Sequence, residues 1–426
     1  MSTVVTPTPT PTPRPTAPTR GSFLANPWAR WGMIVLGAII LMSALRVITG
    51  ANDLDSSGAI AAAFGLAVPI ALAGLGGLWC ERAGVVNIGL EGMMILGTWS
   101  SAFCAYHWGP WVGILGGALG GLVGGLIHAI ATVYFGVDHI VSGVALNIIG
   151  LGVAKYLASR FFTGLPGGGP TQSPPLEYAP SLSLPGIGDP LLTLERKHIF
   201  FVSDLAAIVR GLTTNVSVLT LITLGLFIAT WYVLWRTAFG LRLRSVGESP
   251  AAAESLGVNV YKYKFLAVLA SGSLAGLGGA FLTLVASNLF RDGQTGGRGY
   301  IGLAAMIFGN WRPGGLLAGS ALFGYTDAIR LRAGGQSVHA VLLLVAVLLL
   351  LIGLWQLFRR GRVVQGVLAL VVAGLTAWWY FAADTVPNEL AGTLPYVTTL
   401  LVLAFAAQRL RMPAADGLVY RKGEGH

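Results

Sequence analysis

The chain has 426 residues, of which 54% are hydrophobic and 10% are charged, and its formal net charge is +10. An average soluble domain is roughly 25% charged, so this composition leaves too little polar surface for a water-soluble protein. The positive charge does not indicate a nucleic acid partner, because the basic residues lie in short clusters between apolar runs and form no basic domain.

The first 30 residues form a segment of different composition that is rich in Pro and Thr. Each proline lacks an amide donor, and the segment has little apolar area to bury, so residues 1–30 are expected to form a disordered cytoplasmic tail. No apolar core or small-residue cleavage site precedes Trp31, which argues against a signal peptide.

Apolar segments of membrane-spanning length occupy residues 31–410 and predict an all-α, polytopic transmembrane helical bundle. They lie at 32–50, 58–79, 88–106, 111–134, 140–161, 213–235, 265–287, 314–331, 338–358, 363–382 and 393–408. A shorter segment, 300–309, cannot cross alone, so a broken or re-entrant helix is expected near 300–313. The bundle should therefore contain about 10–12 membrane segments.

Basic residues predict the orientation of these segments, because Lys and Arg concentrate in cytoplasmic loops. The stretch 237–264 carries Arg242, Arg244, Lys262 and Lys264 and is expected to be a cytoplasmic coupling loop. The loop 162–211 is nearly balanced in charge and rich in Pro and Gly, so it is expected outside the cell. If 300–309 counts as a pass, both termini are inside, and residues 411–426 form a second cytoplasmic tail.

Glycines recur at every fourth position between residues 109 and 125. Because a spacing of four places each row on one helix face, we expect neighbouring helices to pack there almost backbone to backbone. One row contains Gly113, Gly117, Gly121 and Gly125, and the second contains Gly116, Gly120 and Gly124.

A polar stretch, ERAGVVNIGLEGM at 81–93, lies between two predicted spans and at the start of the second. A carboxylate inside the bilayer is costly unless it is paired or faces a polar cavity. Glu91 is therefore a candidate either for a translocation pathway or for a buried structural pair, and the sequence does not separate the two. Glu81 and Arg82, at the edge of the span, are expected to be interfacial or paired with each other.

The loop LRLRSVGESPAAAESLG at 241–257 carries a complete set of helix signals. Ser249 can cap a helix, Pro250 suits its first position and Gly257 suits a left-handed exit. We therefore expect a short helix with an alanine face and basic flanks, which can seat in a groove of another protein. A plain connecting turn is the alternative interpretation.

Glycines also bracket the short apolar segment in GGRGYIGLAAMIFGNWRP at 296–313. Irregular backbone of this kind is tolerated at membrane depth only where it lines a cavity or is buried in protein. The sequence contains no P-loop, HExxH, GxSxG or His/Cys cluster, so no catalytic residues, metal site or cofactor are expected.

Together these three stretches resemble the permease subunits of bacterial ABC importers in the branched-chain amino acid and simple sugar family. The stretch ERAGVVNIGLEGMM is most similar to the nucleoside or simple sugar subgroup. The resemblance implies a multi-pass transport subunit of the bacterial cell membrane, not an enzyme, that carries nucleosides or related small polar solutes. Simple sugars and branched-chain amino acids are the alternative solutes. A secondary transporter is less favoured, because it would lack the capped alanine helix.

The resemblance also assigns residues and partners. The ATPase-coupling motif is matched by Gly247, Glu248, Ser249, Pro250, Ala252, Ala253 and Gly257, where Ser249 replaces a frequent Asn. The candidates for the substrate pathway are Asn87, Glu91, Gly92 and Asn147. The implied partners are separate ABC ATPase subunits, a second related permease and an extracellular solute-binding lipoprotein. The helix pair 338–382 departs from the family pattern and is expected to face lipid or a partner.

Overall fold

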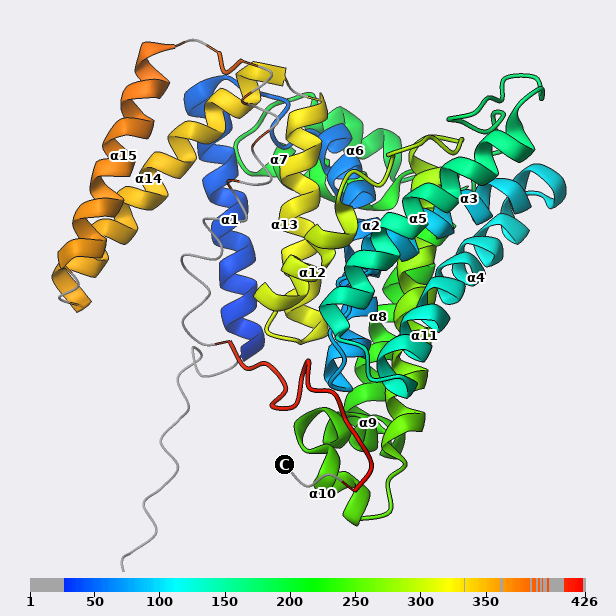
Figure 1. The fold of residues 1–426 in the computed structure, drawn as a ribbon. Coiled ribbons are helices and arrows are strands. Elements are labelled where there is room, and N and C mark those ends of the chain that lie inside the picture. Colours follow the sequence, from blue (N-terminus) through cyan, green and yellow to red (C-terminus); the bar gives the residue numbers. More distant parts are fainter. Residues whose placement is uncertain are drawn as a thin grey trace, which may run out of the picture.

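The computed structural model describes residues 27–332, 334–360, 363–383 and 410–423, together with isolated residues between 385 and 397. Within these ranges the chain forms a bundle of helices that run between two ends (Figure 1). Seven of the described helices are long and apolar enough to cross a membrane. The predicted all-α polytopic bundle is therefore confirmed, while the tail before Pro27 and nearly all of the span expected at 393–408 lie outside the described residues.

The long helices match the predicted spans, with ends that differ by a few residues. They are α1 (Pro27–Thr49), α2 (Ser57–Arg82), α3 (Leu90–Trp108), α4 (Pro110–Ala129) with the π-helical turn η2 (Ile130–Tyr134), α5 (His139–Phe162), α8 (Val218–Arg236), α11 (Val260–Phe281) with the π-helical turn η3 (Leu282–Ala286), α13 (Pro313–Arg332), α14 (Gly334–Arg360) and α15 (Val363–Ala382).

Two predicted helix starts are wrong, and in both cases a capping residue decides the boundary. Helix α11 begins at Val260 and not at 265, because the Asn259 side chain accepts a hydrogen bond from the amide of Lys262. Helix α8 begins at Val218 and not at 213, because Ser217 caps it in the same way. Hydropathy alone misses both starts, since a cap is a local hydrogen bond.

The two glycine rows of α4 pack against two different helices, as predicted. One row faces α11, where a side chain added at Gly121 would collide with the Gly272 carbonyl and lie 2.5 Å from the Cα of Gly276. The second row faces α3, where a side chain added at Gly120 would lie 2.7 Å from the Cβ of Ser100. Glycine therefore allows α4 to contact α3 and α11 at backbone distance.

The variant Gly121→Ala is expected to destabilise the bundle, because the new methyl group has no room between α4 and α11. Overpacking of this kind costs about 1–3 kcal/mol. The melting temperature of the purified protein in detergent should therefore fall. Gly225→Ala is the matched control, since a Cβ on Gly225 of α8 meets nothing within 4 Å. Equal melting temperatures for the two variants would contradict close packing at Gly121.

The segment predicted as the loop 162–211 contains regular structure of its own. It holds α6 (Gly188–Glu195) and α7 (Val202–Thr213), and the two-residue strands β1 (Ser181–Leu182) and β2 (Val216–Ser217) pair antiparallel. These elements gather at one end of the bundle (Figure 1). The Pro- and Gly-rich composition therefore hides a small subdomain at what we call the α6–α7 end.

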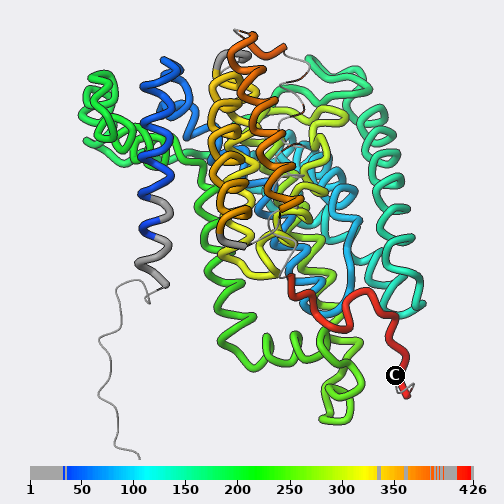
Figure 2. The backbone as a smooth tube through the Cα atoms, turned by 90° about the vertical axis from the view of Figure 1, so that its left-hand side faces the viewer, coloured from blue at the N-terminus to red at the C-terminus, as the bar shows by residue number. Residues whose placement is uncertain are grey.

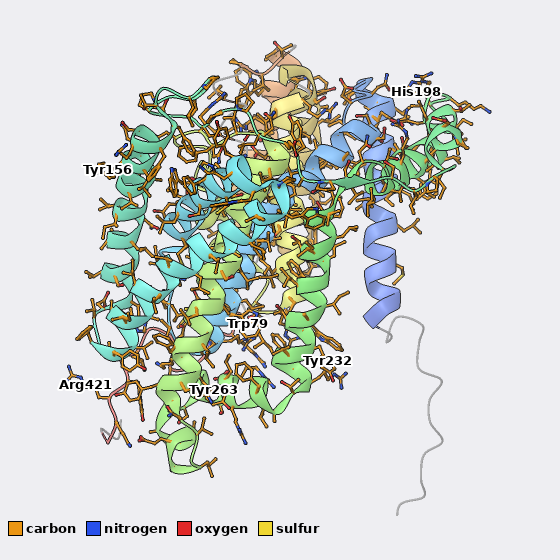
Figure 3. The ribbon with its side chains drawn as sticks, turned by 90° about the vertical axis from the view of Figure 1, so that its right-hand side faces the viewer. Trp79, Tyr156, His198, Tyr232, Tyr263 and Arg421 are labelled. Carbon is orange, nitrogen blue, oxygen red and sulfur yellow. The ribbon has the colours of Figure 1, made fainter. Side chains whose placement is uncertain are left out.

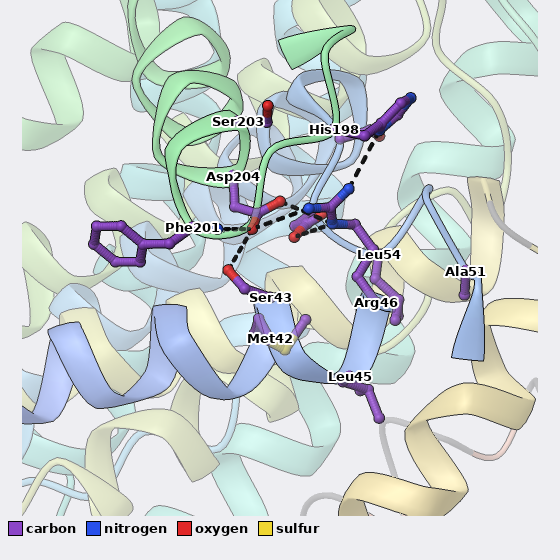
Figure 4. A network of polar contacts seen from close by, with 12 residues as sticks. Met42, Ser43, Leu45, Arg46, Ala51, Leu54, His198, Phe201, Ser203 and Asp204 are labelled. Atoms are coloured by element: carbon purple, nitrogen blue, oxygen red, sulfur yellow. Dashed lines mark hydrogen bonds and ion pairs between the residues drawn. The ribbon is translucent and has the colours of Figure 1, made fainter. Parts of the chain in front are cut away.

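A buried ion cluster fixes α1 to this end (Figure 4). The Arg46 guanidinium lies 2.9 Å from the Asp204 carboxylate and 3.6 Å from that of Asp55. Ser43 donates a hydrogen bond to Asp204, and the His198 ring nitrogen lies 3.2 Å from the guanidinium. Burial, together with the nearby Asp204 carboxylate, raises the pKa of Asp55 to about 7. The cluster holds the loop after α1 and the start of α7 together.

The opposite end of the bundle carries α9 (Ala238–Glu248), α10 (Pro250–Ser255) and the C-terminal residues 410–423 (Figures 1 and 2). Figure 3 shows Arg421 and Tyr263 at this α9–α10 end and His198 at the other. Helix α1 also begins toward the α9–α10 end (Figure 1). The described start and end of the chain thus lie on the same side of the bundle.

Helices α14 and α15 form a hairpin at the side of the bundle, near α1 (Figure 1). Only 17% of the most apolar window of α14 is buried, and only 11% of that of α15. Apolar helices with so little protein contact are solvated by lipid or covered by a partner. That 338–382 lies away from the solute path stays a prediction.

Candidate functional site

The first functional region surrounds the short helix α12 (Arg298–Phe308), which occupies only part of the bundle depth. Glu91, in the first turn of α3, accepts hydrogen bonds from the amides of Gly297 at 2.9 Å and Gly299 at 2.7 Å. A carboxylate at a helix N-terminus satisfies amides that lack a helical partner, and it also interacts favourably with the helix dipole. Glu91 thus caps a half-helix inside the bundle.

The glycines around Arg298 make this contact possible. Gly297 has φ +80°, a left-handed conformation that side chains disfavour. At Gly299 an added Cβ would lie 2.6 Å from the Cα of Glu91. The sequence left two roles open for Glu91, a place in the translocation pathway or in a buried structural pair. In the structure its carboxylate is buried and bonds to backbone amides of α12. Its predicted place in the substrate pathway stays a prediction.

Asn147 of α5 joins three elements at the side of this half-helix. Its side-chain oxygen accepts from the Gly92 amide at 2.7 Å, and its amide group donates to the Ile88 carbonyl at 3.0 Å. The same amide group donates to the Tyr300 hydroxyl at 2.8 Å. Asn147 is half-buried and Tyr300 is 46% exposed, so this pair offers polar groups to a ligand. We missed Tyr300 from the sequence, although it lies within the glycine-bracketed stretch.

The other two candidates, Asn87 and Gly92, are enclosed by protein. Asn87 is fully buried and donates to the Ser271 hydroxyl of α11 at 2.8 Å. A Cβ on Gly92 would lie 2.9 Å from the Cα of Asn147, so this glycine allows α3 and α5 to approach. The structure therefore brings all four candidates to the junction of α3, α5, α11 and α12, and among them Asn147 is the most accessible.

A charged network that the sequence analysis did not assign anchors the start of α12 to α13. The Arg298 guanidinium lies 2.7 Å from one carboxylate oxygen of Asp327, and Arg330 lies 2.8 Å from the other. Charged residues within an apolar span are a signal for such a network, because they are costly unless paired. Arg298 thus fixes the half-helix from one side, while Glu91 fixes it from the other.

The second functional region is the pair α9 and α10, which contains the predicted coupling motif. Gly257 has φ +79° and ends the turn after α10 as predicted. Pro250 occupies the first turn of α10, also as predicted, but the Ser249 hydroxyl makes no capping bond. Its carbonyl instead accepts from the Ala253 amide at 3.0 Å. The short helix is therefore present, with a backbone start in place of the predicted side-chain cap.

The alanine face of α10 is divided between the protein interior and the surface. Ala253 is buried, whereas Ala251, Ala252 and Ser255 are exposed. The next residue, Leu256, is 84% exposed. A large apolar side chain with so little cover at the tip of a structured loop is typical of a protein contact site. The surface available to a partner, which we call the α10 knob, is Ala251, Ala252, Ser255 and Leu256.

The two charged residues at the end of α2 link α9 to the turn between α12 and α13. Glu81 accepts from the Trp311 indole at 2.6 Å, and Arg82 donates to the Trp311 carbonyl at 2.6 Å. Arg82 also lies 4.0 Å from Glu248 of α9. Of the two alternatives expected for Glu81 and Arg82, mutual pairing is wrong, because both side chains are directed to Trp311. A Cβ on Gly247 would collide with the Arg82 carbonyl, so α9 packs directly on this end.

Comparison with known proteins decides the family. The family described as branched-chain amino acid transport system / permease component matches residues 59–354, which is more than half of the chain. The chain belongs to this family. Being a member, it is a membrane-spanning permease component, and the match includes both the half-helix region and the α9–α10 pair. The match ends at residue 354, within α14, so α15 lies beyond it. Both helices of this pair were expected to depart from the family pattern.

Individual permeases are similar to the chain over most of their length. The guanosine ABC transporter permease protein NupQ of Bacillus subtilis is 31% identical over 84% of this chain and 94% of its own. The nucleoside ABC transporter permease protein NupC of Lactococcus lactis is 33% identical over 84% and 94%. The putative glucose ABC transporter permease protein TsgC13 of Haloferax volcanii is 31% identical over 84% and 96%. No solved structure matches the chain significantly.

Proposed function

We propose that this permease carries nucleosides across the cell membrane as part of an ATP-driven importer. The observation that carries the proposal is the similarity to NupQ and NupC, at 31% and 33% identity over 84% of the chain. The exposed Tyr300 ring beside the Asn147 amide suits such a solute, because an aromatic ring can stack on a base and an amide can bind its edge or the sugar.

The energy for transport comes, in this proposal, from separate ATPase subunits that bind the α10 knob. The α9–α10 end supports this assignment because Arg242, Arg244, Lys262 and Arg421 lie in its segments, whereas the segment 162–211 at the α6–α7 end is nearly balanced in charge. An excess of Lys and Arg marks the cytoplasmic side of a membrane protein. ATPase subunits would therefore meet α10 inside the cell, and a solute-binding lipoprotein would meet the α6–α7 end outside.

A second permease completes the path in this proposal. NupQ and NupP of Bacillus subtilis are both guanosine permease proteins of one organism and are 31% and 27% identical to the chain. Helix α5 exposes Val144, Ile148 and Leu151 beside Asn147. If a partner permease covers this apolar face, the Asn147–Tyr300 pair lies at the boundary between the two subunits, where a path for the solute can form.

Uptake into proteoliposomes that contain the permease, its ATPase subunits, the second permease and the binding protein tests the proposal. We expect ATP-dependent uptake of labelled guanosine that unlabelled nucleosides inhibit and that glucose and leucine do not. Inhibition by glucose alone would favour the second candidate, a glucose permease, which the similarity to TsgC13 supports. Uptake of nucleosides that does not depend on ATP would contradict the importer assignment.

A further inference from the structure

The C-terminal segment at residues 410–420, here called the C-terminal strap, runs along the α9–α10 end of the bundle (Figure 1). From the sequence, this region was expected to form only a tail. The strap instead has buried residues, among them Ala415 and Asp416. A segment without helix or strand that is nevertheless buried must be held by specific contacts, because its backbone groups need partners.

Those contacts join the strap to the two functional regions. At one point the Arg411 amide donates to the side-chain oxygen of Asn310, in the turn between α12 and α13, at 2.8 Å. Three residues later the Ala414 amide donates to the Glu248 carboxylate at 3.2 Å, and the Ala415 amide donates to the Gly247 carbonyl at 2.9 Å. The strap therefore bridges the end of α9 and the turn that follows the half-helix.

Further contacts hold the remaining part of the strap against α11. The Lys264 ammonium group donates to the Leu418 carbonyl at 3.3 Å and to the Gly84 carbonyl at 3.2 Å. The ring of Tyr420 meets that of Tyr261, with centroids 5.3 Å apart. These bonds tie the strap to the loop after α2 and to the first turns of α11.

The bridge matters because the principal neighbours of α9 and α10 do not include α12 or α13. Helices α9 and α10 pack against each other and against α8, α11 and α2. Besides the packing of α2 on both regions, two described connections link this pair to the α12–α13 turn. They are the Arg82 side chain, which lies between Glu248 and Trp311, and the C-terminal strap. A movement of α10 can therefore reach the half-helix through these two connections.

Asp416 lies at the middle of the strap and faces Glu81 of α2. The two carboxyl groups are within hydrogen-bonding reach of each other, and both oxygens of Asp416 are buried. Two buried carboxylates in contact require one shared proton, because like charges at this distance repel. The other charged or titratable groups that act on Asp416 are Lys264, Arg82 and Cys80.

We propose that the C-terminal strap couples the α9–α10 pair to the half-helix α12, and that Asp416 is the positioning residue that holds the strap on α2. This inference rests on the proposed docking of an ATPase on the α10 knob. The strap adds to that proposal a second mechanical connection, made by the last described residues of the chain. It also gives a role to the C-terminal sequence RMPAADGLVY at 411–420.

Truncation tests the inference in the complete transporter. Removing residues 413–426 deletes the contacts to Glu248, Glu81 and Lys264 but leaves the α10 knob intact. We expect ATPase subunits to co-purify with this variant, while the number of solutes transported per ATP falls at least tenfold. Removing residues 423–426 alone is the matched control and should leave this ratio unchanged. An unchanged ratio in the larger truncation would overturn the inference.

Point variants at Asp416 keep the test decisive if the truncated protein does not assemble. Asp416→Ala removes the shared proton and is expected to lower the transport ratio about as strongly as the truncation. Asp416→Asn supplies an amide donor to Glu81 and is expected to restore the ratio. A purely structural role would instead change protein yield and leave the ratio of assembled complexes intact. A normal ratio in Asp416→Ala would overturn the role of Asp416.

The dependence of coupling on pH gives a second readout. Burial raises the pKa of Asp416 to about 7 from an ordinary value of 3.8. The docked strap therefore binds a proton that a released strap does not, so docking weakens as the pH rises from about 4 to about 7. The wild-type transport ratio should therefore fall between about pH 4 and pH 7 on the α9–α10 side. Asp416→Asn should abolish this fall, and a fall retained in that variant would contradict the role of Asp416 titration.

These outcomes separate the inference from the function on which it rests. If wild-type complexes show no ATP-dependent uptake, the proposed function fails and the strap has nothing to couple. If wild-type complexes are coupled and both the truncation and Asp416→Ala remain coupled, only the inference fails.

Discussion

Replacing Glu91 by alanine is expected to reduce transport per assembled complex at least tenfold. The carboxylate accepts two amide hydrogen bonds from the start of α12, and hydrogen bonds to charged groups contribute about 1.5–3 kcal/mol each. Without the carboxylate, the amides of Gly297 and Gly299 remain unsatisfied in a buried position. The half-helix should then lose its fixed position beside the Asn147–Tyr300 pair. Uptake in proteoliposomes, normalised to folded permease, measures the effect.

Two further variants separate the loss of the α12 cap from the loss of a carboxylate in general. Glu91→Gln keeps one acceptor oxygen and should give an intermediate rate, because its amide group cannot accept the second hydrogen bond. Glu177→Ala is the control for loss of a carboxylate, since Glu177 is exposed and lies before β1. Wild-type uptake in Glu91→Ala would show that the cap on α12 is dispensable for transport.

The membrane bundle could be predicted from the sequence because its signals are summed over many residues. Each span collects the hydropathy of about 20 positions, so a few polar residues do not hide it. The glycine rows of α4 were equally readable, since a spacing of four places side chains on one helix face. The half-helix was predicted from the glycines that bracket residues 300–309, and it is present as α12.

The partners of the polar residues could not be predicted, because they depend on helix rotation and depth. Glu91 is separated from Gly297 by about two hundred residues, and no local pattern specifies their contact. The same is true of Glu81, whose neighbour Asp416 lies in a segment without helical periodicity. Sequence reasoning could show that an intramembrane carboxylate needs a partner. Only the folded chain shows that the partner of Glu91 is a helix N-terminus.

The same reasoning applies to the coupling motif. The small and polar residues between Gly247 and Gly257 were readable as a short helix, and the helix exists as α10. Which alanine faces a partner depends on how α10 packs on α9 and α11. The structure places Ala253 inside and leaves Ala252 and Leu256 outside, so the variants that test docking must be chosen from the exposed pair.

The variant Ala252→Trp is expected to weaken binding of the ATPase subunits without unfolding the membrane bundle. Ala252 is exposed in the isolated chain, so the added ring clashes only with a partner that seats closely on the α10 knob. Overpacking costs about 1–3 kcal/mol, which corresponds to a complex weaker by roughly 5- to 150-fold. Leu256→Asp should act in the same direction, because it places a charge at the apolar centre of the contact.

A control variant and a second variant make this experiment decisive for the coupling proposal. Ala252→Ser is the control, since its small side chain should be nearly silent in binding and in solute-stimulated ATP hydrolysis. Gly257→Val should resemble Ala252→Trp for a different reason. A Cβ there meets nothing within 4 Å, so the defect would come from the φ of +79°, which a β-branched residue resists. The measurements are ATPase co-purification and solute-stimulated ATP hydrolysis of the reconstituted complex. If Ala252→Trp and Leu256→Asp leave both unchanged, α10 is a plain connector and the ATPase must bind elsewhere on the permease.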